Sequence, residues 1–460
     1  MTQTLTCISP IDGSVFAERP VPRRAEADSA VARARAAQAG WAARPLAERV
    51  DLVRKGIARV GAMNDEIVPE LARMMGRPVR YGGEFGGFEE RGIHMADIAE
   101  EALAPIVVES SDAFERRIER EPHGVVLVIA PWNYPWMTAI NTVAPALIAG
   151  NTVMLKHATQ TLLVGERMVR AFVEAGVPAD VFQNVFLDHD TTSALIAAHS
   201  FDFVNFTGSV GGGRAMERAA AGTFTPLGLE LGGKDPGYVL DDADPAAAAA
   251  GLVDAAMFNS GQCCCGIERI YVHESLYDDF VARAVDIVRT MKLGNPLNRE
   301  TTIGPMASRR FADLVRTQIA EAVAAGATAH IAPFPEDDGG TYLTPQILTG
   351  VTHEMRVMRE ESFGPVVGIM PVRDDAHAIA LMNDSEFGLT AALWTPDAGR
   401  AARIGRQLQT GTVFMNRADY LDPALCWTGC KNTGRGGGLS VIGYHNLTRP
   451  KSYHFKKGAS

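Results

Sequence analysis

Short apolar runs alternate with helical stretches from residue 124 onward, and Gly, Pro or Asn bounds each run. Continuous apolar runs of this length are typical of parallel strands that are buried on both faces and joined by helices. We therefore predict an α/β fold of the doubly wound, Rossmann-like kind. The strands of its first sheet are expected at Val125–Ala130, Thr152–Lys156, Val181–Phe186, Phe201–Phe206 and Pro226–Leu231.

Helical periodicity is clear between these runs and before them. The stretch Thr161–Ala175 places its apolar residues on one face and ends at Gly176, with Pro178 beyond, which is a usual helix stop. The first hundred residues look mainly helical, with Ala-rich amphipathic stretches at Ala25–Gly40 and Leu46–Met63. We expect these helices to cover the first sheet.

A second α/β alternation begins after the glycines and proline of 232–237, and it predicts a second domain with its own sheet. Its strands are expected at Tyr238–Leu240, Ile267–Val272, Val366–Met370, Thr390–Trp394 and Thr412–Met415. Two segments fit neither domain, namely Phe114–Pro122 and the tail Leu439–Phe455. Extended segments that alternate polar and apolar residues predict a small β arm that pairs with another subunit.

Composition narrows the class of protein. A chain of 460 residues exceeds the size of one compact core, and its formal charge is 44 − 54 = −10, which disfavours nucleic-acid and anionic-membrane partners. The N-terminus lacks the pattern of a secretory signal, and the apolar runs are too short or too polar to cross a bilayer. We expect a cytoplasmic protein.

Six cysteines are too few for a disulfide framework in a chain of this length. Three are consecutive, in the stretch Gly261–Cys265, which follows a helical stretch and precedes a predicted strand. A thiol in such a turn is held rigidly and is accessible, which suits a nucleophile, whereas the alternative is three small buried apolar residues. Cys426 and Cys430 lack a second Cys or His pair nearby, so we predict two half-buried thiols rather than zinc, and no metal.

Three further stretches carry chemical groups. Asn133 follows the carboxyl end of the first strand, where an amide could stabilise an oxyanion, although Pro131–Pro135 could be a simple turn. Glu230 stands between leucines, which should raise its pKa toward that of a general base, unless it is a solvated strand end. Phe206–Gly213 could receive a pyrophosphate at a helix start, but its glycines do not match the dinucleotide fingerprint.

These four stretches, in this order, resemble the aldehyde dehydrogenase superfamily over nearly the whole chain. Further matching stretches are Gly150–Lys156, Glu360–Pro365 and Thr433–Gly436. The resemblance implies a cofactor-binding domain (1–108 and 124–233), a catalytic domain (234–432) and an oligomerisation arm (109–123 and 433–460). It also implies a homodimer or homotetramer and a small-molecule aldehyde substrate.

The resemblance assigns roles to particular residues. It selects Cys264 as the nucleophile, Asn133 as the oxyanion donor and Glu230 as the general base. The resemblance also implies NAD as the cofactor, with NADP as the alternative. The cofactor site is expected to contain Trp132, Lys156, Thr159, Gly208, Ser209, Gly213, Leu231, Glu361 and Phe363. Around the substrate channel it places Tyr134, Trp136, Phe258, Tyr420 and Trp427.

The implied reaction oxidises an aldehyde to a carboxylic acid through a thiohemiacetal and a thioester on Cys264. Family members often carry Pro and Glu where this chain has His157 and Thr159, which leaves the choice of NAD or NADP undecided. Aromatic walls would suit an aromatic or amino-aldehyde, and equally an aliphatic one. The alternatives are a semialdehyde dehydrogenase that transfers the acyl group to coenzyme A, and an inactive binding or structural relative.

Overall fold

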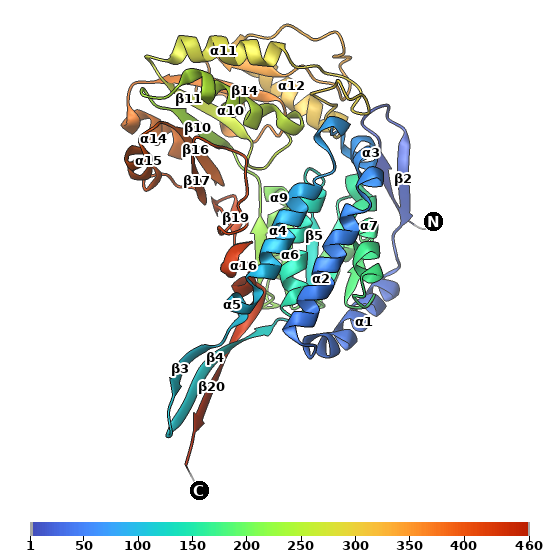
Figure 1. Cartoon of the computed structure of the whole chain (residues 1–460). Coiled ribbons are helices and arrows are strands. Elements are labelled where there is room, and N and C mark those ends of the chain that lie inside the picture. The colour runs from blue at the N-terminus through green and yellow to red at the C-terminus, as the bar shows by residue number, and fades with distance from the viewer. Residues whose placement is uncertain (1–2, 459–460) are drawn as a thin grey trace.

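The computed structural model describes residues 3–458 and contains two α/β lobes, with a β arm that extends from the lower lobe (Figure 1). Each lobe is built on its own mainly parallel sheet, and the chain crosses between the lobes directly after the first sheet. No helix among the described residues is long and apolar enough to cross a membrane.

The lower lobe contains a six-stranded sheet whose strands are parallel except for one short edge strand from the C-terminal region. Val125–Ala130 forms its central strand and is buried along its whole length, as expected for a parallel strand covered on both faces. In spatial order the strands are β19 (Gly434–Arg435), β9 (Leu227–Glu230), β8 (Phe203–Thr207), β5 (Val125–Ala130), β6 (Thr152–His157) and β7 (Phe182–Asn184).

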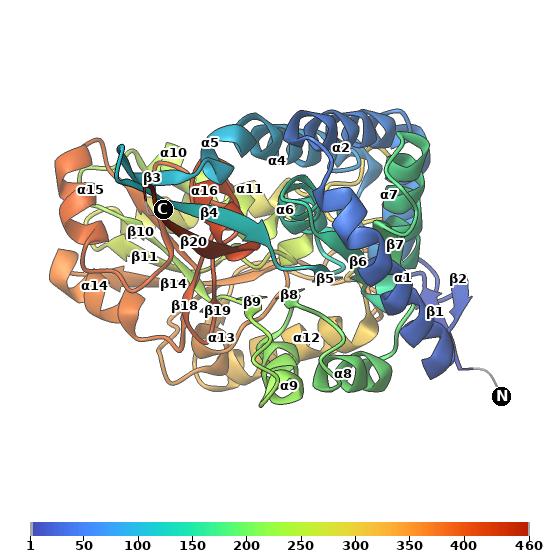
Figure 2. The ribbon, with the colours of Figure 1, turned by 90° about the horizontal axis from the view of Figure 1, so that it is seen from below.

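Helices cover both faces of this sheet (Figure 2). On one face the core includes residues of α2 (Leu46–Gly61), α3 (Asn64–Met75), α4 (Phe85–Asp97), α5 (Ala99–Leu103), α6 (Pro135–Ile148) and α7 (Leu162–Glu174). The opposite face is covered by α1 (Arg24–Ala42), α8 (His189–Ala197) and α9 (Val210–Ala220). The predicted α/β fold is therefore confirmed in this lobe.

Local differences from the predicted elements have physical causes. The N-terminal region is mainly helical as predicted, but it begins with a hairpin of β1 (Thr4–Ile8) and β2 (Val15–Pro20), whose turn contains Asp12 and a left-handed Gly13 with φ 75°. The expected strand Val181–Phe186 is shortened to β7, because it lies at the sheet edge and pairs on one side only.

The upper lobe contains a seven-stranded sheet that is parallel except at one edge. In spatial order its strands are β12 (Thr328–Ala329), β13 (Gln346–Thr349), β14 (Val366–Val372), β11 (Ile267–His273), β10 (Asp235–Val239), β16 (Thr390–Trp394) and β17 (Thr412–Met415). The sheet is flanked by α10 (Pro245–Met257), α11 (Tyr277–Arg289), α12 (Arg309–Ala324), α13 (Arg356–Arg359), α14 (Asp375–Asn383) and α15 (Ala398–Gly405).

The arm is an antiparallel sheet of three strands, β3 (Ile106–Ser110), β4 (Phe114–Pro122) and β20 (Thr448–Lys456). Strands β4 and β20 pair from Thr448 opposite Pro122 to Lys456 opposite Phe114. The first strand of the arm begins at Ile106, before the expected residue 109, whereas β19 completes the lower sheet and Ser440–Asn446 forms helix α16. The residue boundaries of the domains stay a prediction.

Trp136 lies in the core of the lower lobe. Its side chain is 1% exposed, and its ring meets that of Phe88 edge to face at 5.8 Å between centroids. The expectation that Trp136 lines the substrate channel is wrong, because the first turn of α6 points this side chain inward, toward α4.

Replacement of Trp136 by alanine should destabilise the lower lobe, because it removes a large buried ring and leaves a cavity. We expect the free energy of unfolding to fall by about 3–5 kcal/mol, measured from the midpoint and slope of urea denaturation. Val173→Ala, at a position where the side chain is 36% exposed, is the control and should cost much less. Equal losses in the two variants would contradict the assigned burial.

Candidate active site

A cavity of about 190 Å³ lies where the two lobes meet. Its walls come from segments far apart in the sequence: α4, the start of α6, the end of β9, the cysteine turn before β11, and the segment 419–427. Both Cys264 and Glu230 line it. The two predicted reactive residues, 34 positions apart, therefore face one enclosed space.

The cysteine turn has an unusual backbone that only close packing explains. Asn259, Ser260 and Gly261 are all left-handed, with φ of 54°, 58° and 68°. A Cβ on Gly261 would lie 2.2 Å from the carbonyl oxygen of Gly364, so no other residue fits there. Gln262 anchors the turn further, since its side-chain oxygen accepts a hydrogen bond from the Ala307 N–H at 2.8 Å.

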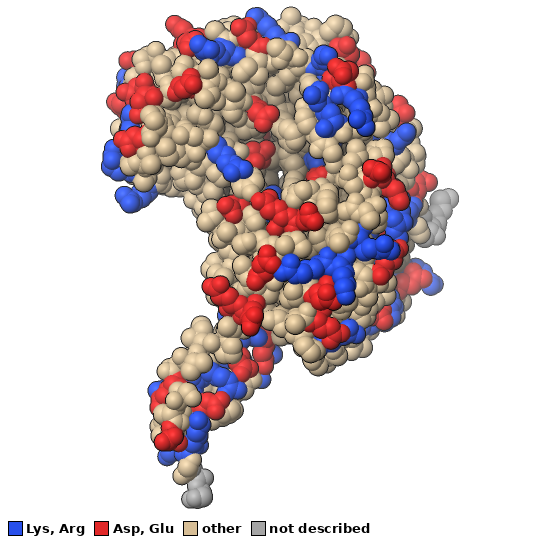
Figure 3. Space-filling view, viewed as in Figure 1, with Lys and Arg blue, Asp and Glu red and all other residues tan. Residues whose placement is uncertain are grey.

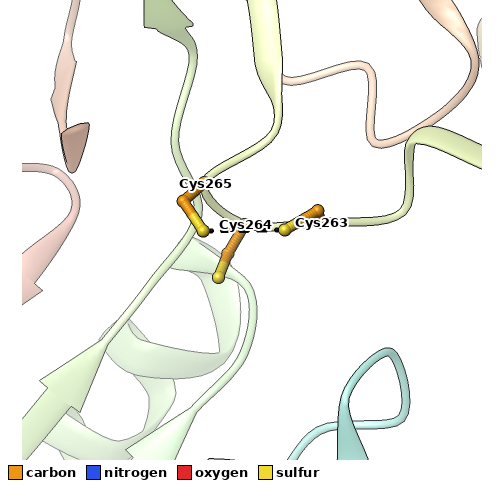
Figure 4. Close-up of side chains that lie close together, drawn as sticks. All are labelled: Cys263, Cys264 and Cys265. Carbon is orange, nitrogen blue, oxygen red and sulfur yellow. Dashed lines mark hydrogen bonds between the residues drawn. The ribbon is translucent and has the colours of Figure 1, made fainter. Parts of the chain in front are cut away.

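The three thiols that follow point in different directions (Figure 4). The sulfur atoms of Cys263 and Cys265 are 3.6 Å apart, and each thiol donates to a carboxylate oxygen of Asp419, at 2.9 and 3.1 Å. The sulfur of Cys264 points away from this pair, and its residue is the least buried of the three.

The surroundings separate the acidities of the three thiols. The sulfur atoms of Cys263 and Cys265 lie within 4.8 Å of that of Cys264, and these neighbouring thiols lower the pKa of Cys264 below its ordinary value, whereas their own pKa values are raised. The same turn therefore makes Cys264 the thiol that ionises first, and a thiolate is the nucleophilic form of cysteine.

Asn133 lies beside this turn, in the segment that joins β5 to α6. It is 4% exposed, and its amide Nδ2 donates to the carbonyl oxygen of Gln262 at 3.2 Å. Its own carbonyl oxygen accepts hydrogen bonds from Arg77, at 2.6 Å, and from Asn259, at 3.2 Å. These contacts fix the amide of Asn133 against Gln262, which is two residues from Cys264 in the sequence.

Glu230 ends β9 with its carboxylate beneath the cavity. The only hydrogen bond to this carboxylate within the described residues comes from the hydroxyl of Thr207, at 3.3 Å. Burial raises the pKa of Glu230 to about 7, and this single hydrogen bond only partly offsets the effect. A carboxylate with such a pKa can both accept and release a proton near neutral pH.

The carboxyl ends of β5, β6 and β8 form a second region next to the cavity. The strand order of the lower sheet reverses direction between β5 and β8, and ligands of doubly wound sheets bind in the crevice at such a point. Trp132 follows β5, and α9 starts beyond β8, where the Ser209 hydroxyl accepts a hydrogen bond from the Gly212 N–H at 3.2 Å.

Lys156 near the end of β6 adds a cation to this region. It is 6% exposed and forms no ion pair within residues 3–458, and burial lowers its pKa to about 8. Gly208 and Gly213 lie along the same wall, and a Cβ on Gly213 would lie 2.7 Å from Leu231. A buried cation, a helix start and close-packed glycines fit a dinucleotide with a pyrophosphate, so the region fits the predicted cofactor.

Glu361 and Phe363 border this region from the upper lobe. The carboxylate of Glu361 accepts a hydrogen bond from the Gly233 N–H at 3.0 Å, and the Phe363 ring meets Trp132 edge to face at 5.5 Å. Thr159 is exposed, and the neighbouring His157 is buried, with neither ring nitrogen hydrogen-bonded to any of the residues 3–458.

Sequence reasoning missed the buried polar residues that hold these groups. Glu268 accepts hydrogen bonds from Lys234, at 2.6 Å, and from the N–H groups of Ser362 and Phe363, both at 2.8 Å. A charged residue inside the apolar run 267–273 was the available signal. Arg77, Glu84, Arg91 and Asp419 were also missed, since each stands in a segment that looks like an ordinary exposed helix or loop.

The remaining aromatic residues predicted for the channel do line the cavity: Tyr134, Phe258, Tyr420 and Trp427. The guanidinium of Arg77 covers the ring of Tyr134 at 4.6 Å, and the Tyr420 hydroxyl donates to Glu90 at 2.5 Å. Outside the cavity, Cys426 and Cys430 are half-buried free thiols.

Comparisons with known proteins agree with this site. The sequence model of the aldehyde dehydrogenase family matches residues 1–453. The chain belongs to the aldehyde dehydrogenase family. The predicted fold, the aldehyde-oxidising enzyme class and the NAD(P) cofactor are thereby confirmed.

Individual relatives are similar over almost their whole length. Vanillin dehydrogenase of Corynebacterium glutamicum is 34% identical, covering 94% of this chain and 90% of its own. Succinate semialdehyde dehydrogenase [NAD(P)+] of Escherichia coli is 32% identical, with 96% and 95% covered. The crystal structure of NADP-dependent glyceraldehyde-3-phosphate dehydrogenase from Bacillus halodurans with NADP has a TM-score of 0.94 at 33% identity, covering 99% and 96%.

The acidity of Cys264 can be tested by alkylation. Iodoacetamide should label Cys264 first, and the labelling rate should fall as the pH falls through the lowered pKa, because the thiolate is lost. Cys265→Ala removes one of the two neighbouring thiols that lower the pKa of Cys264 and should move the midpoint upward by about one pH unit. Mass spectrometry of the labelled peptide measures the rate, and Cys430→Ala is the control. A midpoint unchanged in Cys265→Ala would refute the assigned cause.

Proposed function

We propose that this chain oxidises an aldehyde to the carboxylic acid, with Cys264 as the nucleophile and Glu230 as the general base. The observation that carries the proposal is that both residues line one cavity while the Asn133 amide lies beside the cysteine turn. Nucleophile, base and oxyanion donor are the groups that acyl chemistry on a thiol needs.

The first step is attack of the Cys264 thiolate on the aldehyde carbon. The carbonyl oxygen gains the negative charge, and the Asn133 amide, held by Gln262 and Arg77, donates to it together with the Cys264 backbone N–H. Because Asn133 is fixed before the substrate arrives, little reorganisation accompanies the charge development.

The nicotinamide dinucleotide, when bound, supplies the acceptor for the hydride that leaves the thiohemiacetal carbon. Lys156, Ser209 and Glu361 would hold it at the carboxyl ends of β6 and β8 and against the upper lobe. Trp132, Gly208, Gly213, Leu231 and Phe363 would form the adjoining walls, with Thr159 at the exposed rim.

Glu230 then takes a proton from water, which attacks the thioester carbon and releases the carboxylic acid and the Cys264 thiol. The presence of this buried carboxylate favours water over coenzyme A as the acyl acceptor. Transfer to coenzyme A remains the alternative, and an acyl-coenzyme A product would establish it.

We infer that the enzyme uses NAD and also accommodates NADP. At Thr159 a hydroxyl replaces the carboxylate that would repel a 2′-phosphate, and no carboxylate forms an ion pair with the neighbouring Lys156 in the described part of the chain. The kcat/KM values for the two cofactors measure this directly.

The named relatives act on vanillin and on succinate semialdehyde, which are chemically unlike, so the substrate depends on the cavity of each enzyme. The aromatic wall of Tyr134, Phe258 and Trp427 supports an aromatic aldehyde. An amino-aldehyde is disfavoured, because the Arg91 guanidinium lines the same cavity and repels a cation.

Glu230→Gln should stop the reaction after the thioester forms. We expect steady-state turnover to fall by about 10²–10⁴-fold, with a retained burst of one NADH for each active site. In the native enzyme the rate of thioester hydrolysis should rise as the pH rises through about 7, because the carboxylate is the active form.

Rapid-mixing absorbance at 340 nm measures both phases. Glu174→Gln, at an exposed carboxylate that pairs with Arg59 on the lower lobe, is the matched control and should behave as the native enzyme. Loss of the burst together with turnover in Glu230→Gln would assign Glu230 to an earlier step. If no aldehyde of a varied panel reduces NAD or NADP, the inactive alternative is correct.

We also propose that the arm joins subunits into a homodimer or homotetramer. Strand β3 is an edge strand, and its Ile106, Val107 and Val108 are 59%, 64% and 58% exposed. A row of exposed apolar side chains on an unpaired edge favours association with a second chain.

Val107→Lys should therefore weaken the assembly by placing a charge in the contact. Light scattering after size exclusion should show wild type at a multiple of 49.3 kDa and the variant shifted toward this monomer mass. Val323→Lys, at an exposed position of helix α12, is the control and should not change the mass. A monomeric wild type would exclude the proposal.

A further inference from the structure

Arg91 is a buried cation in the wall of the catalytic cavity that the proposed chemistry does not use. It lies in α4 and is only 7% exposed, yet it lines the same space as Cys264 and Glu230. Its one hydrogen bond to the described residues runs from a terminal nitrogen to the carbonyl oxygen of Met137, at 3.3 Å, and its Nε has no partner.

The negative groups around Arg91 do not neutralise it. The ionisable groups whose charges act on the pKa of Arg91 are Cys265, Glu84, Cys264 and Glu230. Glu84 is committed to an ion pair with Arg77 and caps the first turn of α6. Glu230 forms no ion pair with Arg91 within residues 3–458, and its raised pKa leaves it partly protonated near neutral pH.

Asn141 lies in the same wall, one helix away. It is 2% exposed, it lines the cavity, and both its amide nitrogen and its oxygen lack hydrogen-bond partners among the described residues. Buried polar groups are normally satisfied, and an unpaired buried amide or guanidinium is costly. Two such groups in one cavity wall indicate that a bound ligand supplies their missing hydrogen-bond partners.

The rest of the cavity wall selects the kind of ligand. Arginine remains protonated and presents a planar fork of N–H donors that matches a carboxylate, and an amide adds a further donor. The one exposed carboxylate of the wall, Glu90, lies at the solvent side and accepts a hydrogen bond from Tyr420, whose ring is covered by Arg417 at 3.4 Å. The hydrogen bond from Tyr420 and the nearby guanidinium of Arg417 thus offset the negative charge of Glu90.

On the face shown in Figure 3, both acidic and basic side chains occur on both lobes. Inside the cavity, a low dielectric makes a charge pair strong.

We propose that Arg91 and Asn141 bind a carboxylate of the substrate, so that the preferred substrate is an aldehyde that carries a carboxylate at some distance from the reacting carbon. This inference rests on the proposed function, because it names the substrate class of the same site. The aromatic wall would hold the body of the molecule while the carboxylate pairs with the guanidinium.

Two aldehydes of nearly equal shape test the proposal, namely 4-formylbenzoate and benzaldehyde. We expect the wild-type enzyme to show the higher kcat/KM for 4-formylbenzoate. Arg91→Gln should lower that kcat/KM by about 10- to 100-fold, mainly through KM, and should lower the kcat/KM for benzaldehyde much less. Arg91→Lys should restore part of the loss, and Asn141→Leu should produce a smaller loss in the same direction.

Turnover of benzaldehyde reports whether each variant folds and keeps its chemistry. The control is Arg289→Gln, at an exposed arginine of α11 on the upper lobe, which removes the same charge far from the cavity and should leave both substrates unaffected. Equal losses for both aldehydes in Arg91→Gln would show that Arg91 acts on the thiol, the base or the fold instead. A wild-type preference for benzaldehyde would overturn the proposal.

A binding measurement separates this inference from the proposed function. Isothermal titration of the unreactive pair 4-methylbenzoate and 4-methylbenzamide compares a carboxylate with a neutral group of the same shape. We expect wild type to bind the carboxylate more tightly, and Arg91→Gln to lose the difference. This result can stand even if no aldehyde is oxidised, whereas equal affinities in wild type would refute the carboxylate site alone.

Discussion

The buried guanidinium of Arg77 joins the three segments on which the catalytic centre depends. It pairs with Glu84, whose carboxylate caps the start of α6, and it donates to the Asn133 carbonyl and the Asn259 side chain. One planar group thus connects the amide beside the cavity with the cysteine turn. Removing one partner of such a pair leaves an uncompensated buried charge, so the arrangement holds as a unit.

Desolvation is the common physical cause of the unusual chemistry around this unit. The space between the lobes withdraws Glu230, Arg91 and Lys156 from water, which raises the pKa of the acid and lowers those of the two bases. The cysteine turn differs, because there the neighbouring thiols favour the anionic form of Cys264. Burial thus raises the pKa of Glu230, the proton acceptor, whereas the neighbouring thiols lower the pKa of Cys264, the nucleophile.

The parts of this architecture that the sequence predicts are those with a local signal. The run Val125–Ala130 is apolar because both of its faces are covered, and its bounds were predicted correctly. The sequence shows Gly261 in the cysteine turn, but not why a glycine is required there. The cause is the close contact with Gly364, which is distant in the sequence. Trp136 was misplaced because a sequence motif does not tell which side of a helix faces the core. The burial of Arg91 was not predicted, because the hydrophobic periodicity of its helix does not indicate that a charged side chain is buried.

The pairing of β19 with β9 has a consequence for the order of events during synthesis. Gly434 lies opposite Glu230 at the edge of the lower sheet, and Thr433 accepts the Leu231 N–H at 2.9 Å, so the strand that carries this carboxylate is completed by a segment near the end of the chain. A ribosome must release almost the whole polypeptide before this edge can close. The cysteine turn is synthesised earlier, whereas the sheet edge beside Glu230 is completed only after residue 434 has been made.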